Sequence, residues 1–248
     1  MERATGERPF LTARWENLLL LNFECPSEVL EPLVPLGTSL DPWEGRTLVS
    51  LVGFMFRDTR VRRVAVPGHR TFEEVNLRFY VRREVPGEVP RRGVVFVREF
   101  VPRRMIAEVA RRLYNEPYLA VSMWNRGRID PKSGGDIEYG WKLGPSTFSM
   151  QAVARGPASE TASGSEGELI TEHYWGYTRQ RDGGTVEYEV AHPRWRVWEA
   201  QDASFSGDAS ELYGPALGEV LAGRPRSAFL ALGSEVSVYP GRRLNVRD

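Results

Sequence analysis

Apolar and polar residues alternate strictly along residues 71–85, TFEEVNLRFYVRREV. One row consists of Val75, Leu77, Phe79 and Val81, and the other of Glu74, Asn76, Arg78, Tyr80 and Arg82. Successive side chains of a β-strand point to opposite faces, so this pattern predicts a strand with one face in a core. The polar row carries a carboxylate, an amide and a guanidinium two residues apart. On an open sheet this row would face water, whereas in a closed barrel it would line a cavity.

The rest of the chain predicts strands at short intervals with few helices. Residues 46–57 are apolar on both faces, which indicates a strand that is buried on both sides. Helices are predicted at 27–35 and 103–115, and a helical turn near residue 168 stays open. The other expected strands are 10–24, 93–102, 118–124, 137–143, 147–155, 168–178, 185–193, 194–201 and 235–240. We therefore expect a mainly β protein, an antiparallel barrel or sandwich with two or three short helices.

Composition narrows the class of protein. The chain has 248 residues, 41% hydrophobic and 27% charged, which fits one domain over residues 1–248 with a mobile loop near residues 156–168. No apolar run approaches the ~20 residues that cross a bilayer, so no membrane association is expected. The single cysteine, Cys25, excludes an internal disulfide and favours the cytoplasm. The net charge of zero gives no basic face for nucleic acid.

Five stretches in chain order resemble one known family. They are FLTARWENLLLLNFECPSEVLEPLVP, TFEEVNLRFYV, RRLYNEPY, LITEHYWGYT and AHPRW. Together they resemble the YqjF-like bacterial family of unknown function (DUF2071-type), which looks like a distant branch of the acetoacetate decarboxylase-like superfamily. The resemblance implies a cone-shaped, mostly antiparallel β-barrel around a central cavity.

The resemblance also implies site residues. In the decarboxylases a glutamate from a central strand and an N-terminal arginine line the cavity; Glu74 looks like that glutamate, and Arg14 is similar to that arginine. The decarboxylases carry a lysine pair just after a proline, and one of the pair forms the Schiff base. Here the equivalent place reads Pro117-Tyr118-Leu119, without lysine. Decarboxylation through an iminium is therefore not carried over.

The candidate catalytic residues are Glu74 as proton donor or acceptor, Arg78 as carboxylate holder and Tyr118 as hydrogen-bond donor. Asn76, Arg14 and His192 are candidate ligand-binding residues. A purely structural role stays open for each of them. The polar row could be a solvated strand face with a cross-strand ion pair, Tyr118 could be an ordinary strand aromatic, and His192 could cap a turn before Pro193.

Other chemistry finds little support in the sequence. Three scattered histidines and one cysteine do not have the spacing of a zinc site, so no metal and no cofactor are expected. The expected partner is a small organic acid, and formation of a homo-oligomer stays open. The leading hypothesis is binding of that acid in a barrel cavity, with turnover without a Schiff base left open. The alternative is a non-catalytic ligand-binding or structural barrel.

Overall fold

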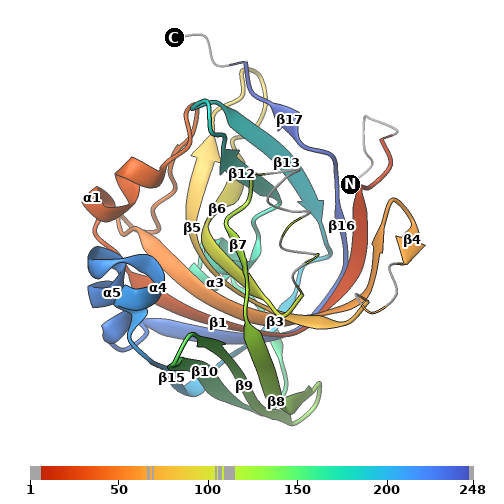
Figure 1. The fold of residues 1–248 in the computed structure, drawn as a ribbon, viewed down its shortest axis with the longest axis vertical. Coiled ribbons are helices and arrows are strands. Elements are labelled where there is room, and N and C mark those ends of the chain that lie inside the picture. The colour runs from red at the N-terminus through yellow and green to blue at the C-terminus, as the bar shows by residue number, and fades with distance from the viewer. Residues whose placement is uncertain are drawn as a thin grey trace.

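The main sheet closes on itself to form a barrel. A computed structural model describes residues 7–65, 68, 70–103, 105, 108 and 115–245 of the chain. The ring runs β16, β1, β3, β5, β6, β12 and β13, and β13 pairs again with β16 (Figure 1). These strands are β1 (Leu11–Glu24), β3 (Leu48–Val61), β5 (Phe72–Arg83), β6 (Arg91–Val101), β12 (Trp175–Arg179), β13 (Thr185–Ala191) and β16 (Ser227–Val238). Closure leaves an interior that alternate side chains of every strand must line.

A second sheet and short helices complete the fold. The second sheet has the order β15 (Gln201–Ser206), β10 (Ser146–Arg155), β9 (Gly134–Leu143) and β8 (Ser122–Asp130). Short strands extend the main sheet: β2 (Ser39–Leu40), β4 (Val64–Ala65), β7 (Tyr118–Ala120), β11 (Ser159–Glu160), β14 (Arg196–Glu199) and β17 (Arg242–Arg243). The helices are α1 (Ser27–Leu30), which continues into a 3-10 turn at Glu31–Leu33, α3 (Glu166–Thr171), α4 (Ala209–Tyr213) and α5 (Pro215–Ala222).

The barrel departs from the expected antiparallel pairing at one strand. β6 pairs in parallel with both β12 and β7, whereas the other ring pairings are antiparallel. A parallel pair needs a long crossover connection. The chain supplies one between β6 and β12, because β8, β9, β10 and α3 lie between them in the sequence.

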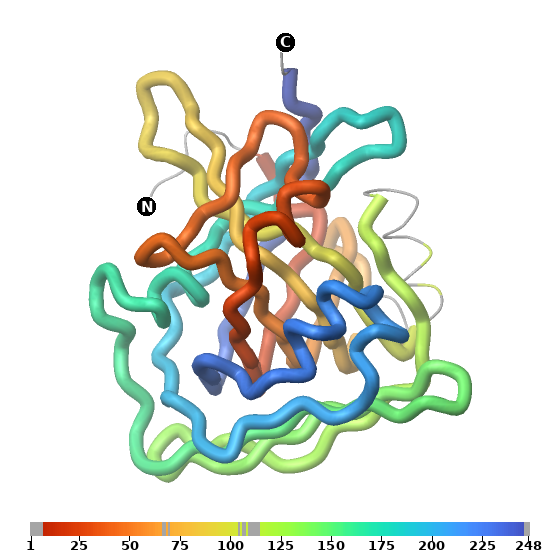
Figure 2. Tube along the Cα trace, turned by 90° about the vertical axis from the view of Figure 1, so that its left-hand side faces the viewer, coloured from red at the N-terminus to blue at the C-terminus, as the bar shows by residue number. Residues whose placement is uncertain are grey.

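The apolar row of β5 forms the outer layer of the core, as the alternation predicts. Val75, Leu77 and Phe79 are completely buried and belong to one cluster with Tyr139 and Trp141 of the second sheet. That cluster also contains apolar residues of α4 and α5. Figure 2 shows the second sheet and these helices beside the barrel wall. The apolar row of β5 is therefore buried outside the barrel, and the second sheet, α4 and α5 contribute to the layer that covers it.

β3 confirms the prediction of a strand buried on both sides. Every residue from Leu48 to Phe56 is buried. Val49 and Leu51 contribute to the outer cluster, and Val52 to the inner one. Gly53 makes close packing possible, since a Cβ there would lie 2.6 Å from the ring of Tyr139. The barrel wall at β3 is thus buried on both faces.

Several local predictions changed. α4, α5 and β15 were not anticipated, because their segments lack strong periodicity. The expected loop near residues 156–168 contains β11, which pairs with β14, and the first turn of α3. The expected final strand at 235–240 is the end of the longer β16. The predicted helix 103–115 lies almost wholly outside the described residues.

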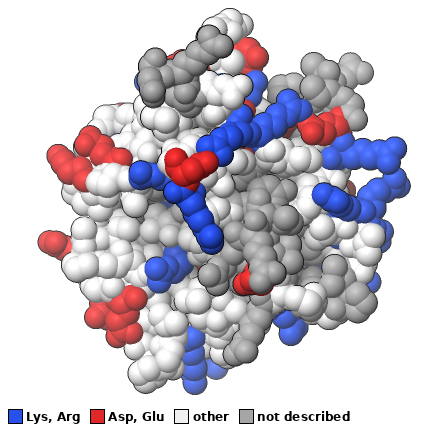
Figure 3. Space-filling model, turned by 45° about the horizontal axis from the view of Figure 1, so that its top comes forward, with Lys and Arg blue, Asp and Glu red and all other residues white. Residues whose placement is uncertain are grey.

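The surface carries both signs of charge. Figure 3 shows one face on which acidic and basic side chains both occur, some of them side by side. Ion pairs such as Arg243–Asp182, 2.6 Å apart, neutralise some of these charges. Within the described ranges, none of the helices is both long enough and apolar enough to cross a membrane.

The outer packing of β5 predicts a large stability loss on truncation of Leu77. We expect Leu77→Ala to lower the free energy of unfolding by roughly 2–5 kcal/mol, because the substitution leaves a cavity between two sheets. Val89→Ala is the control, since Val89 is 84% exposed and should change stability by less than about 0.5 kcal/mol. Urea denaturation measures both variants, and equal stabilities would contradict the packing.

Candidate functional site

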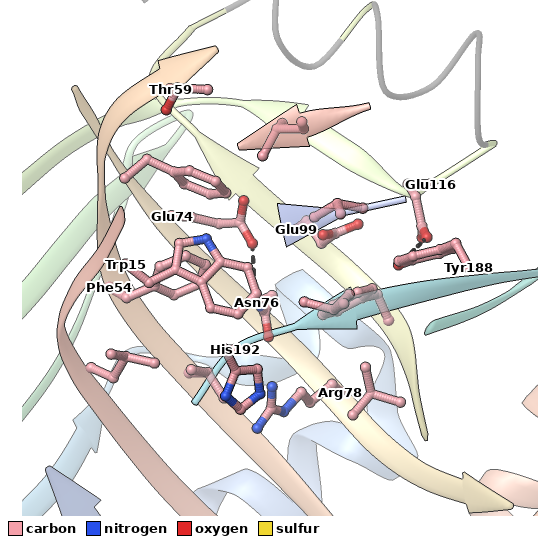
Figure 4. A pocket seen from close by; sticks show the side chains of 18 of the residues that line it. Trp15, Phe54, Thr59, Glu74, Asn76, Arg78, Glu99, Glu116, Tyr188 and His192 are labelled. Atoms are coloured by element: carbon pink, nitrogen blue, oxygen red, sulfur yellow. Dashed lines mark hydrogen bonds between the residues drawn. The ribbon is translucent and has the colours of Figure 1, made fainter. Parts of the chain in front are cut away.

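The barrel encloses a cavity of about 240 Å³. Its walls are mostly aromatic and aliphatic, and Figure 4 shows polar side chains pointing into it from several strands. The cavity is smaller than the ~300–1,000 Å³ of sites for drug-sized ligands. The apolar wall residues include Trp15, Phe54, Phe56, Phe72, Phe96 and Trp195. Such a space suits a small molecule with an apolar body and a few polar groups.

Three residues of the polar row of β5, Glu74, Asn76 and Arg78, face this cavity. Glu74 and Asn76 are each only 2% exposed, and both line the cavity together with Arg78. Glu74 Oε1 accepts a hydrogen bond of 3.0 Å from Asn76 Nδ2, and its Oε2 accepts one of 2.9 Å from the Tyr118 hydroxyl. The open-sheet alternative is excluded, since a solvated strand face would expose these side chains. Tyr118, at the start of β7, also lines the cavity.

Two further carboxyl groups lie at the same end of the cavity. Glu99 projects from β6 directly opposite Asn76, and Glu116 lies just before β7. Glu116 Oε1 accepts hydrogen bonds from the hydroxyls of Tyr188, at 2.8 Å, and Thr178. We call Glu74, Glu99 and Glu116 the acidic cluster.

Burial governs the protonation of the acidic cluster. It raises the pKa of Glu74 to about 7, against the opposing effect of the hydrogen bonds from Asn76 and Tyr118. Burial likewise raises the pKa of Glu116 to about 7 and that of Glu99 well above its ordinary value. Neighbouring carboxylates add to the rise for Glu99. The cluster therefore holds protons near neutral pH and can both donate and accept them.

Figure 4 shows Arg78 and His192 at the other end of the cavity, which we call the arginine end. His173 also lines the cavity, and its ring is close enough to Arg78 for the charge of the guanidinium to act on it. Arg78 Nη2 donates a hydrogen bond of 3.0 Å to the Ile170 carbonyl oxygen, which fixes the guanidinium. His173 is buried, and its Nε2 lies 3.6 Å from Asp41 Oδ2. Burial lowers the pKa of His173 to about 4, so its ring is neutral at pH 7.

His192 lies at the turn before Pro193 and also lines the cavity. Its Nδ1 lies 2.9 Å from the Pro193 carbonyl oxygen, which can only accept, so Nδ1 carries the proton and Nε2 is an acceptor. The ring stacks on Trp195 at 4.2 Å between centroids. It also lines the cavity, and burial lowers its pKa. His192 therefore caps the turn and still offers a hydrogen-bond acceptor at the site.

Several buried polar atoms on the cavity wall have no hydrogen-bond partner among the described residues. They are Trp15 Nε1, Thr59 Oγ1, Asn76 Oδ1, Arg78 Nε, Glu99 Oε2 and both ring nitrogens of His173. A buried polar atom left unpaired costs about 1–3 kcal/mol. These atoms converge on one space, so a polar ligand in the cavity could satisfy them.

Arg14 does not belong to the site, and this corrects the sequence prediction. On β1, Trp15 faces the cavity, so the preceding side chain points to the outer face. Arg14 is 54% exposed there and pairs with Glu16, with Nε 2.8 Å from Oε1. The ion pair that the polar row could have formed is also absent: within the described part of the chain, Glu74 and Arg78 make no direct salt bridge. Glu74 is held by Asn76 and Tyr118, and Arg78 by Ile170.

Glu99, Glu116, Tyr188 and His173 were missed as site residues. Glu99 is hidden by a register shift in the β5–β6 pair between Leu77 and Arg78. The shift inserts an extra residue on β6 and reverses its alternation, so that both Phe96 and Glu99 line the cavity. Gly176 on β12 leaves room for the Tyr188 ring, because a Cβ at this position would lie 2.1 Å from that ring. A glycine within a predicted strand was therefore the one signal for Tyr188.

The site offers no lysine and no metal-binding group within the described residues. Lys132 lies in the β8–β9 turn and Lys142 on β9, and both are exposed and outside the cavity lining. No three or more histidine, cysteine, aspartate or glutamate side chains among the described residues are arranged to hold a metal ion. His69 lies outside the described residues.

Comparison with known proteins places the chain in a family. Residues 12–235 match the family model DUF2071, described as an uncharacterized conserved protein. The chain belongs to the DUF2071 family. It is also 26% identical over 209 residues to the uncharacterized protein YqjF of Bacillus subtilis (strain 168), covering 83% of this chain and 82% of that protein. The resemblance seen in the sequence is therefore confirmed.

Solved structures confirm the fold. The chain is similar to the enduracididine biosynthesis enzyme MppR complexed with pyruvate, with a TM-score of 0.68, 10% identity and coverage of 97% and 93% of the two chains. It is also similar to an acetoacetate decarboxylase-like enzyme from Sphingomonas wittichii RW1, with a TM-score of 0.65, 14% identity and coverage of 98% and 96%. An acetoacetate decarboxylase gives a TM-score of 0.64 at 11% identity, with coverage of 96% and 90%. The mainly β, acetoacetate decarboxylase-like fold is thus established.

The raised pKa of Glu116 predicts a pH-dependent stability. The pKa of Glu116 is 4.5 in the unfolded chain and about 7 in the folded protein. Between these two pH values the folded protein keeps a proton on Glu116 that the unfolded chain has lost. The stabilisation is complete below about pH 4.5 and is lost as the pH rises through about 7. With rising pH, the ionisation of Glu116 should lower the free energy of unfolding of the parent protein by up to about 1.4 kcal/mol per pH unit. We expect Glu116→Gln to lack this contribution.

Urea denaturation between about pH 5 and pH 8 measures this slope. Glu31→Gln is the control, since Glu31 is exposed and its replacement should leave the slope of the parent protein unchanged. Identical slopes for Glu116→Gln and the parent protein would contradict the buried, protonated carboxyl group.

Proposed function

We propose that this protein binds a small organic acid in the barrel cavity, with the ligand carboxylate on Arg78. The observation that carries the proposal is Arg78 Nε, a buried donor on the cavity wall that has no hydrogen-bond partner among the described residues. Its guanidinium is already oriented by Ile170, and a carboxylate is the group that matches its planar fork. The neutral rings of His173 and His192 lie beside Arg78 and do not compete with the ligand carboxylate for the guanidinium. The apolar walls would hold the body of the ligand.

Glu74 is placed to move a proton on a ligand bound in this way. It lies two strand positions beyond Asn76, in the same row as Arg78, and has a pKa of about 7. A general acid or base works best when its pKa is near the working pH. Tyr118 donates to Glu74 and keeps its own proton, because burial and the nearby carboxylates raise its pKa. This pair could exchange a proton at a carbon next to a ligand carbonyl group.

Schiff-base chemistry has no support in this site. An iminium needs an uncharged lysine amine beside the substrate carbonyl. Lys132 and Lys142 are exposed and do not line the cavity. Any reaction would therefore depend on Glu74, Tyr118 and Arg78 as proton and charge carriers. The competing function is a barrel that binds the acid without turning it over, and the open cavity supports binding in both cases.

Substitution of Arg78 tests the binding function. We expect Arg78→Met to weaken binding of para-toluate, a small aromatic acid, by roughly 2–5 kcal/mol, which is about 30-fold or more, because the carboxylate loses its charged partner. Isothermal titration calorimetry measures the affinity, and the fluorescence of Trp15 gives a second readout at the cavity wall.

Arg82→Met is the matched control on the same strand. Arg82 is 48% exposed and lies 3.6 Å from Glu84, so its loss should leave affinity unchanged. Circular dichroism establishes that both variants fold. Equal affinities for the two variants would refute Arg78 as the carboxylate holder.

Hydrogen exchange separates catalysis from simple binding. If Glu74 moves protons, the protein accelerates deuterium uptake from heavy water at the carbon next to the carbonyl of a bound keto acid, and Glu74→Gln abolishes the effect. NMR follows the exchange. Borohydride treatment should leave the protein mass unchanged, because no iminium forms. Binding of keto acids without faster exchange would favour the non-catalytic barrel, and a borohydride adduct on Lys142 would restore Schiff-base chemistry.

A further inference from the structure

The acidic cluster is not explained by the binding of a carboxylate. Glu74, Glu99 and Glu116 line one end of a cavity whose other end carries Arg78. Each is at most 7% exposed, and the described residues place no lysine or arginine side chain other than Arg78 on the cavity wall. Three carboxyl groups buried together repel one another when ionised, and this repulsion adds to the effect of burial, which is the main cause of the raised pKa of Glu99. A simple organic acid would add one more negative charge to this space.

Unpaired acceptors at this end point to a donor on the ligand. Asn76 is 2% exposed, its Nδ2 already donates to Glu74, and its Oδ1 has no partner among the described residues. Glu99 Oε2 is likewise unpaired and belongs to the residue directly opposite Asn76 on β6. Asn76 Oδ1 can only accept, and Glu99 becomes an acceptor when it gives up its proton. Together they would recognise an N–H group, and best a charged one, because a nearby cation favours the ionised carboxylate.

The strand geometry sets the spacing of the ligand groups. Arg78 lies two residues beyond Asn76 on the cavity face of β5, so the two Cα positions are about 7 Å apart. The space between the two ends is bordered by aromatic walls such as Trp15 and Phe54. A ligand that satisfies both ends needs an apolar spacer of roughly this length.

We infer that the cavity takes a small organic acid that also carries a cationic nitrogen group, separated from its carboxylate by an apolar spacer. The inference rests on the proposed function, since the carboxylate is placed on Arg78. The ammonium or amidinium group would lie among Glu74, Glu99 and Asn76, where it neutralises the acidic cluster and supplies the missing donors. α-Amino acids do not fit, because their two charges are adjacent.

Pairs of ligands with and without a cationic nitrogen group test this inference on the unaltered protein. Calorimetry compares para-(aminomethyl)benzoate with para-toluate, and ε-aminocaproate with caproate and with norleucine, an isomer whose amine is next to the carboxylate. The amine at the far end should tighten binding by about tenfold or more in each comparison, since a charge-assisted hydrogen bond is gained. Norleucine should gain nothing over caproate.

Two variants test whether the acidic cluster causes the preference for the amine-bearing ligands. Glu99→Gln should erase the preference for the amine-bearing ligand of each pair. Glu73→Gln should keep it, because Glu73 is the neighbouring carboxylate on β5 but accepts a hydrogen bond from Asn125 of β8 outside the cavity. Circular dichroism controls for folding, and the ligand pairs on the unaltered protein carry the test if Glu99→Gln does not fold.

The outcomes separate the two proposals. Equal affinity of the paired ligands, with binding that still depends on Arg78, would overturn the cationic group and leave the proposed function intact. If no acid of the panel binds, both the proposed function and this inference fail. Tighter binding of the amine-bearing ligands that depends on Glu99 supports both.

Discussion

Closure of the main sheet into a ring is the constraint on which the rest of the structure depends. A closed ring has two faces, and both are removed from bulk water here. The outer face of β5 packs against the second sheet through Leu77 and its neighbours, and the inner face borders the cavity. The same alternation that buries an apolar row outside therefore forces Glu74, Asn76 and Arg78 inside.

Enclosure then sets the chemistry. A carboxyl group on an exposed strand would be ionised at neutral pH, but burial raises the pKa of Glu74 and Glu116 to about 7. The unpaired atoms of Asn76 and Arg78 each cost about 1–3 kcal/mol, and the dry outer core offsets this cost. Residues that lower stability and share one cavity are typical of a site shaped for a ligand.

The sequence predicts the scaffold better than the site. Strict alternation located β5, and two-sided apolar character located β3, because both patterns follow directly from strand geometry. The polar row of β5 and Tyr118 were correctly placed at the cavity. Arg14 was misplaced, since the resemblance alone does not tell which face of β1 it occupies. Glu99 could not be placed, because an irregularity in the β5–β6 register reverses the alternation of β6, and Glu116 precedes a short strand with no periodicity.

In this barrel an arginine and a carboxyl cluster face each other across an apolar space. We propose that a small organic acid occupies this space with its carboxylate on Arg78. A crystal structure of the protein soaked with para-toluate would show whether it does. We expect electron density inside the barrel with the carboxylate oxygens within hydrogen-bond distance of Arg78 Nε. A barrel interior filled by its own side chains, or a ligand bound only outside it, would refute this binding mode.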